Sequence, residues 1–233
     1  MHPTPIEWVR SPDGSRGFSS NPILGLCKIG CPYCYSKNNY RRFKRNPAIR
    51  FDITPLAKIH GRKKPAGIFL CSTHELFGNW IPEHWRYTIF RYIIQCPQHR
   101  FYVLTKRPGN ILMEQMPPNV WLGTTITGEE SEEEQVKRLE SLMDVKAVIH
   151  FVSFEPLLGP IAQEVLEHIA DGWVNWVIIG EQTQPRKKPL WSWVDDIIYA
   201  RVESAGTSLF MKNNLTRLGK TLLTQEFPEE NRC

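Results

Sequence analysis

The chain has 233 residues, of which 41% are hydrophobic and 23% charged, and its formal net charge is +5. This composition is ordinary for a soluble globular protein of one large or two small domains, and no run approaches the roughly 18 apolar residues of a membrane span. The first residues lack the apolar stretch of a signal peptide, so we expect a cytoplasmic protein whose six cysteines are reduced thiols rather than a disulfide framework.

Short apolar runs recur along the chain and predict strands that are covered on both faces, because they are continuous rather than alternating. They are ILGL at 23, AGIFLC at 66, FYVLT at 101, VWLGTTI at 120, HFVSF at 150, WVIIG at 176 and SLFMK at 208. Helical patterns lie between them, at 82–95, at 129–144 and at 189–206, where Val194, Ile197, Ile198 and Val202 form the expected buried stripe.

Strand, helix and strand repeated about six times predict a parallel sheet with right-handed crossovers. We therefore expect an α/β fold, an incomplete (βα) TIM-like barrel with about six or seven parallel strands. No repeat or linker marks a boundary, so we expect a single domain over residues 1–233, with 1–22 as an N-terminal extension and 214–233 as a C-terminal tail.

In such a fold the ligand site lies beyond the carboxyl ends of the strands. Six of the predicted strands end in polar residues: Ser72, Thr73, His74 and Glu75; Thr105, Lys106 and Arg107; Thr124 and Thr125; Ser153 and Glu155; Glu181; Lys212 and Asn213. A helix cap or a turn would explain any single one of these sets. Six sets on one rim predict a pocket for a polar ligand.

Residues 25–36, GLCKIGCPYCYS, hold Cys27, Cys31 and Cys34 in a C-x3-C-x2-C pattern. Thiolates are the preferred ligands of zinc and of iron–sulfur clusters. A structural zinc takes four protein ligands, whereas three thiolates on one loop suit a [4Fe–4S] cluster with one iron left open for another ligand.

The cysteine spacing, with Tyr33 before the last cysteine and a predicted strand before the loop, resembles the signature of the radical S-adenosylmethionine (radical SAM) superfamily. Further segments resemble, in order, a small phage-associated radical-SAM-like family of unknown function: CSTHELFG, LTKRPGN, NVWLGTTI, FVSFEPLLGP and SLFMKN. The placement of Ser72, Lys106 and Thr124 or Thr125 is also similar to the cofactor site of the spore photoproduct lyase family, which repairs DNA.

The resemblance implies that Cys27, Cys31 and Cys34 hold a [4Fe–4S] cluster whose open iron chelates S-adenosylmethionine. An electron from a donor such as flavodoxin or ferredoxin would cleave that molecule and give a 5′-deoxyadenosyl radical. The implied cofactor contacts are Lys106, Ser72 and Thr73 for the methionine end, Thr124, Thr125 and Ser153 for the ribose, and Tyr33 for the adenine. The superfamily's usual Gly-Gly-Glu is replaced here by CSTHE.

Three carboxyl or imidazole groups are candidate catalytic residues. His74 and Glu75 could give a proton near the substrate or could cap a helix. Glu155 precedes a proline at a strand end, where it could contact cofactor or substrate or form a salt bridge.

Residues 37–64 contain ten Lys or Arg and a single acid, Asp52. Such a stretch binds a polyanion or is simply a solvated helix face. It favours a nucleic acid or nucleotide as substrate of the radical enzyme, with a peptide as the second choice. The alternative function is a noncatalytic nucleic-acid-binding module, in which the three cysteines bind zinc with a fourth ligand such as His60.

Overall fold

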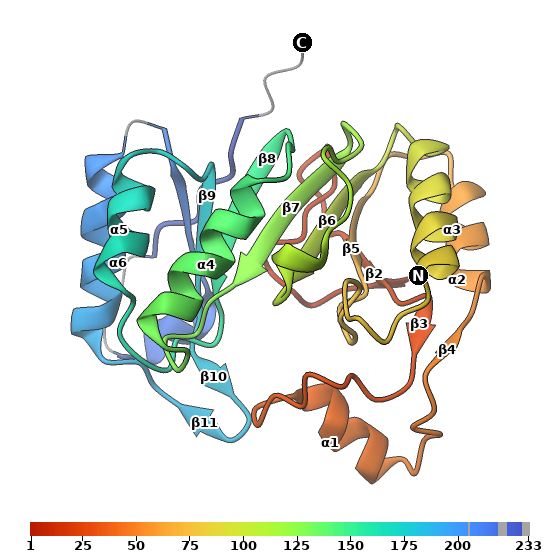
Figure 1. Ribbon diagram of the computed structural model, residues 1–233, viewed down its shortest axis with the longest axis horizontal. Coiled ribbons are helices and arrows are strands. Elements are labelled where there is room, and N and C mark those ends of the chain that lie inside the picture. Colours follow the sequence, from red (N-terminus) through yellow and green to blue (C-terminus); the bar gives the residue numbers. More distant parts are fainter. Residues whose placement is uncertain (205, 219–222, 230–233) are drawn as a thin grey trace. The chain divides into compact units, whose positions relative to one another are not determined.

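The computed structural model describes residues 1–204, 206–218 and 223–229 (Figure 1). The strands are β1 (His2–Pro3), β2 (Phe18–Ser20), β3 (Ile23–Leu24), β4 (Arg50–Phe51), β5 (Gly67–Leu70), β6 (Arg100–Thr105), β7 (Val120–Thr125), β8 (Ile149–Phe154), β9 (Trp176–Ile179), β10 (Gln182–Thr183), β11 (Arg186–Lys187) and β12 (Ser208–Met211). The helices are α1 (Tyr35–Arg42), α2 (Thr54–His60), α3 (Glu83–Ile94), α4 (Glu132–Met143), α5 (Gln163–Ala170) and α6 (Trp191–Glu203), with 3₁₀ turns η1 (Pro108–Asn110) and η2 (Asn213–Leu218). In the described residues, each helix is too short or too polar to cross a membrane.

The main sheet has eight strands in the order β1-β2-β5-β6-β7-β8-β9-β12. The pairs β2–β5, β5–β6, β8–β9 and β9–β12 are parallel, whereas the edge pair β1–β2 is antiparallel. The predicted α/β class and its parallel sheet are confirmed, and six of the seven predicted strands are found in the sheet. Closure into a barrel stays a prediction.

The predicted strand at residue 23 is misplaced. Ile23 and Leu24 form β3, which pairs antiparallel with β4 outside the main sheet. The sheet instead uses β2, whose residues Phe18 to Ser20 pair in parallel with β5. Residues 1–22, expected as an extension, therefore contribute two strands to the sheet. The hydrophobic pattern does not predict β2, because a phenylalanine followed by two serines is not an apolar run.

The chain divides into two compact units, and the first contains Met1–Trp121. Its core is built on aromatic rings. Trp8 packs against Phe69 and Tyr102, with ring centroids 5.0 and 5.8 Å away, and Tyr102 continues to Trp121 at 5.2 Å. The Tyr102 hydroxyl donates to the Arg10 carbonyl at 2.8 Å, so this large ring is buried with its polar atom satisfied.

The second unit contains Leu122–Cys233. Trp176 of β9 is buried among Phe151, Phe210 and Phe227, at centroid distances of 5.8, 6.1 and 5.4 Å. Helix α5 packs between α4 and α6 (Figure 1). The predicted stripe of α6 is wrong at Val202, which is 64% exposed. The single domain stays a prediction, and part of the expected tail, 219–222 and 230–233, lies outside the described residues.

Candidate functional site

The cysteine loop begins at a backbone position that only glycine fits. Gly25 has φ +105°, and a Cβ there would clash with the Ala48 carbonyl oxygen. The Gly25 N–H donates to the Tyr40 hydroxyl at 2.7 Å, and the Leu26 N–H donates to the Pro47 carbonyl at 2.9 Å. These contacts fix the loop against helix α1 and the turn that follows it.

The three predicted ligands, Cys27, Cys31 and Cys34, are free thiols of intermediate exposure on this loop. Cys34 is the N-cap residue of α1, and its N–H donates to the Cys31 carbonyl at 3.1 Å. Burial raises the pKa of the Cys27 thiol, while the N–H groups of Ile29 and Glu75 oppose that increase by hydrogen bonding to the sulfur. Two backbone N–H groups, one from the cysteine loop and one from the loop after β5, therefore favour the thiolate form of Cys27.

The loop after β5 carries the predicted residues Ser72 and Thr73. It opens with Cys71, a buried residue in the left-handed region with φ +54°, and the His74 N–H closes the turn onto the Cys71 carbonyl at 3.0 Å. Asn21, the residue after β2, accepts from the Ser72 hydroxyl and from the Thr73 N–H, both at 3.2 Å. Its side chain holds this loop in place, and no pattern in the sequence indicates that role.

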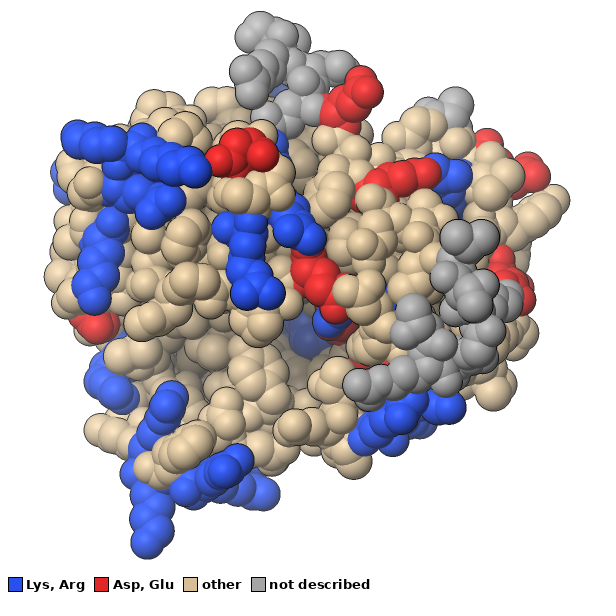
Figure 2. All heavy atoms as spheres, turned by 180° about the vertical axis from the view of Figure 1, so that it is seen from behind, with Lys and Arg blue, Asp and Glu red and all other residues tan. Residues whose placement is uncertain are grey.

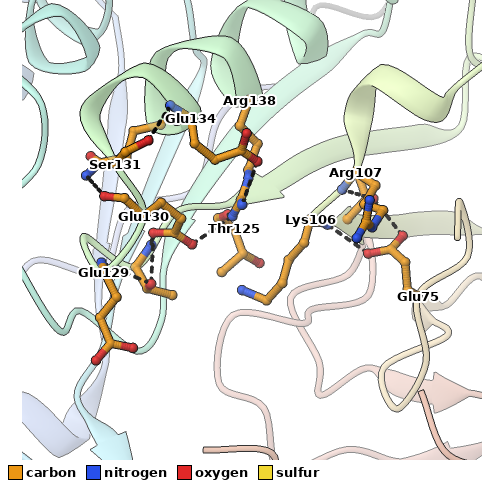
Figure 3. Close-up of polar contacts among 12 residues, drawn as sticks. Glu75, Lys106, Arg107, Thr125, Glu129, Glu130, Ser131, Glu134 and Arg138 are labelled. Atoms are coloured by element: carbon orange, nitrogen blue, oxygen red, sulfur yellow. Dashed lines mark hydrogen bonds and ion pairs between the residues drawn. The ribbon is translucent and has the colours of Figure 1, made fainter. Parts of the chain in front are cut away.

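Glu75 is a buried carboxyl group that joins the loop after β5 to the end of β6 (Figure 3). Its Oε1 accepts from the Phe77 N–H at 3.0 Å and from the Thr105 hydroxyl at 2.6 Å, and its Oε2 accepts from the Lys106 N–H at 2.8 Å. Thr105 in turn accepts from the Arg107 N–H at 2.9 Å. These contacts make Glu75 a positioning residue for Lys106, whatever catalytic role it has.

Lys106 brings the end of β6 to the cysteine loop. Its Nζ is shielded from solvent and lies 5.5 Å from the centroid of the ring of Tyr33, the residue before Cys34. The first unit thus assembles three parts that are far apart in the sequence. They are the cysteine loop, the Ser72–Glu75 segment and Lys106.

His74 is buried in the same region. Its Nδ1 lies 3.2 Å from the Glu75 carbonyl oxygen, which can only accept, so Nδ1 carries the proton. Burial lowers the pKa of His74, and the carbonyls of Glu75 and Leu26 partly oppose this shift. The His74 Nε2 is shielded from solvent and makes no hydrogen bond to the residues described, and the catalytic role of His74 stays a prediction.

In the second unit, Thr124 and Thr125 end β7 and Ser153 lies in β8, and all three are buried. The Ser153 carbonyl accepts from the Ile126 N–H at 3.2 Å, whereas its hydroxyl makes no hydrogen bond to the residues described. A buried hydroxyl in this state has donor and acceptor capacity left for a ligand or a water.

Arg138 of α4 supports the end of β7 in this unit (Figure 3). It donates to the Thr125 carbonyl at 2.7 Å and pairs with Glu130 at 2.8 Å and Glu134 at 3.0 Å. Burial alone would raise the pKa of Glu130, but hydrogen bonds from Thr127 and the charge of Arg138 lower it overall below its usual value. The helical pattern at 129–144 does not by itself indicate that two of its acids hold a partly buried arginine.

Two further predicted residues are engaged in ion pairs within the second unit. Glu155 pairs with Lys212, and a Cβ at Gly180 would come within 2.9 Å of the Lys212 Cδ. Glu181 is buried and accepts from the Arg186 Nε at 3.2 Å. The salt-bridge interpretation of Glu155 is therefore the one that the geometry shows, and its contact with cofactor or substrate stays a prediction.

His60, the alternative fourth ligand for zinc, ends α2, where its Nδ1 lies 3.8 Å from the Cys96 sulfur. Elsewhere in the described residues, the ligand atoms of Glu140, Glu164 and His168 lie within 4.8 Å of one another, a spacing that could hold a metal ion.

These observations define an α/β protein with a largely parallel sheet and a loop of three free thiols. Residues 3–221 match the sequence model of the family described as protein of unknown function (DUF5131), so the chain belongs to that family.

One solved structure is similar in fold, a spore photoproduct lyase double mutant with bound AdoMet and a dinucleoside spore photoproduct. It is 11% identical, with a TM-score of 0.49, and the match covers 83% of this chain and 62% of that enzyme's chain. No curated protein matches the chain.

Proposed function

We propose that this protein is a radical SAM enzyme that cleaves S-adenosylmethionine reductively to a 5′-deoxyadenosyl radical. One observation carries the proposal. Three free thiols lie on a single loop, and the same unit brings the Glu75 N–H to the first of them and Lys106 to the ring beside the third.

The donor set fits a [4Fe–4S] cluster better than a mononuclear zinc. Thiolates suit both, but a tetrahedral zinc with Zn–S bonds of about 2.3 Å needs its sulfurs about 3.8 Å apart. A structural zinc also takes a fourth protein ligand, and His60, the candidate for that place, lies with its Nδ1 3.8 Å from the Cys96 sulfur. A cubane separates its protein ligands further and leaves one iron without a cysteine.

When bound, the cluster would chelate the amino and carboxylate groups of S-adenosylmethionine and supply the electron that breaks its carbon–sulfur bond. Cys27, Cys31 and Cys34 would hold it as thiolates. The N–H groups of Ile29 and Glu75 would remain directed at the Cys27 sulfur, and such hydrogen bonds tune the reduction potential of a cluster.

Other predicted residues of each unit would bind the rest of the cofactor. In the first unit, the Lys106 ammonium would pair with the methionine carboxylate, because a shielded cation strengthens a charge-assisted contact. Ser72 and Thr73, already fixed by Asn21, would add hydroxyl groups, and the Tyr33 ring would face the adenine. The second unit offers Thr124, Thr125 and Ser153 for the ribose hydroxyls.

The acid–base roles are assigned to His74, Glu75 and Glu155. Support for His74 comes from its Nε2, which makes no hydrogen bond to the residues described, whereas the oxygens of Glu75 already accept from three donors. A one-electron donor such as flavodoxin or ferredoxin in the cytoplasm would supply the reducing equivalent.

Metal analysis of anaerobically purified protein tests the proposal. We expect a brown protein with about four irons and four sulfides per chain, loss of both in Cys31→Ala, and 5′-deoxyadenosine formed from S-adenosylmethionine under dithionite. Cys96→Ala is the matched control, since Cys96 is a buried cysteine outside the loop, and it should keep the colour. A colourless wild-type protein with one zinc would overturn the proposal.

A further inference from the structure

The segment of residues 35–50, which we call the basic arm, is made of helix α1, the turn after it and the first residue of β4. It contains six Lys or Arg and no acid. Figure 2 shows Lys and Arg side chains gathered over this part of the first unit, at the lower left of that view. Residues 41–48 are all exposed, so these charges face solvent.

An aromatic ring lies in the middle of this charge. Phe43 is 55% exposed, and the guanidinium carbons of Arg42 and Arg45 lie 5.3 and 5.4 Å from its ring centroid. An exposed ring flanked by two cations is the arrangement that stacks on a nucleic-acid base while its neighbours contact phosphates.

The arm makes hydrogen bonds within itself and is joined to the cysteine loop. The Arg45 N–H donates to the Tyr40 carbonyl at 3.1 Å, and Arg50 Nη1 donates to the carbonyls of Asn46 and Ala48, both at 3.3 Å. Helix α1 begins directly after Cys34. A strand bound along the arm would therefore be delivered next to the three thiols.

We propose that the basic arm is a docking surface for single-stranded nucleic acid, with Phe43 stacked on an unpaired base and Arg42 and Arg45 on the flanking phosphates. A duplex would use the charge but would leave the ring unused, because its bases are already stacked. A membrane would need an apolar helix face, and α1, with the sequence YSKNNYRR, offers only two tyrosines. The further claim that the bound strand is the substrate rests on the proposed function. The claim that the strand binds to the arm does not.

Fluorescence anisotropy with labelled single-stranded dT and U oligomers of about 12 nucleotides, and with a duplex of the same length, tests this inference across a NaCl series. Phe43→Ala should weaken single-strand binding about tenfold, with an unchanged salt slope, and Phe43→Leu should lose as much although it keeps an apolar side chain. Arg42→Gln with Arg45→Gln should lower the slope of log K against log[salt] by about 1.4.

Helix α3 supplies a matched control in the same unit. Tyr87 is 66% exposed, with the Arg91 guanidinium carbon 5.8 Å from its ring centroid, so it repeats the motif away from the arm. The variant Tyr87→Ala with Arg91→Gln should bind like the wild type. Circular dichroism and iron content should be unchanged in all of these variants.

The inference is overturned by Phe43→Ala binding as tightly as the wild type, by equal losses in the α3 control, or by a preference for the duplex. Binding to anionic phosphatidylserine vesicles in place of oligonucleotides overturns it in favour of a lipid surface. A protein that binds the oligomers with the expected variant effects but carries zinc would retain this inference and overturn the radical chemistry.

Discussion

The buried carboxyl group of Glu75 gives the sharpest structural prediction, and Glu75→Gln is the perturbation. Glutamine keeps the size of the side chain and replaces one acceptor oxygen by an amide group that donates. Glu75 accepts from Phe77, Thr105 and Lys106, so one buried donor must face another in every orientation of the new side chain.

The least costly orientation directs the glutamine oxygen at the Phe77 N–H and the Thr105 hydroxyl and leaves the Lys106 N–H opposite the amide. An unsatisfied buried donor costs about 1–3 kcal/mol, and each bond that loses its charged acceptor weakens by about 1 kcal/mol. The free energy of unfolding should therefore fall by about 3 kcal/mol.

Urea denaturation of the cluster-free protein measures this change. The midpoint should fall by about 1 M or more with the m-value unchanged. Glu114→Gln, at an exposed position in the loop after η1, is the control and should leave the midpoint where it is. Thr105→Val removes one of the three donors and should cost about 1 kcal/mol alone and less in the Glu75→Gln background. A midpoint for Glu75→Gln equal to that of the wild type would refute the account of Glu75 as the residue that positions Lys106.

Three further predictions can be tested by urea denaturation, with iron analysis added for the first. Gly25→Ala should destabilise the protein by about 3 kcal/mol and reduce its iron content, because the new Cβ meets the Ala48 carbonyl; Gly14→Ala, also at positive φ but with open space around it, should cost less and leave the iron unchanged. Acid should destabilise the fold through His99, whose Nδ1 accepts from the Ala66 N–H and whose pKa is lowered by burial and by Arg62. The unfolded imidazole takes up its proton near pH 6.5 and the folded one only at lower pH, so stability is lost as the pH falls below about 6.5, and urea titrations of His99→Gln should show a weaker loss. Arg138→Met should cost about 2–4 kcal/mol in the second unit, since the partly buried Glu130 carboxylate loses its partner, while Lys137→Met on the exposed side of α4 should be neutral.

The strands were predictable where burial on both faces leaves a continuous apolar run. Strands β5, β8 and β9 are buried at every residue, and their sequences are almost free of polar side chains. The strand β2 was not predictable, because its parallel pairing with β5 depends on a partner about fifty residues later. Likewise, Ile23 is buried through the β3–β4 pair rather than in the main sheet, and no local pattern separates the two cases.

The site residues likewise divide into those that a local sequence pattern predicts and those that depend on contacts far apart in the sequence. The spacing of Cys27, Cys31 and Cys34 is local, and the sequence alone identified the three thiols as one set. The residues that hold their surroundings act over long separations, with Asn21 reaching Thr73 across 52 residues and Glu75 reaching Thr105 across 30. A short polar side chain such as Asn21 has many ordinary roles, so only its contacts reveal this one.

Under the proposed function, the candidate metal ligands and the candidate ribose-binding hydroxyls belong to different units. The three thiols, the Glu75 N–H directed at Cys27 and the Lys106–Tyr33 contact all belong to residues 1–121. Iron content should therefore depend on substitutions in that unit and be indifferent to Ser153→Ala. The Ser153 hydroxyl, which makes no hydrogen bond to the described part of the chain, belongs to the other unit. Its removal should weaken S-adenosylmethionine binding alone, because a buried hydroxyl that bonds only to a ligand stabilises only the liganded state.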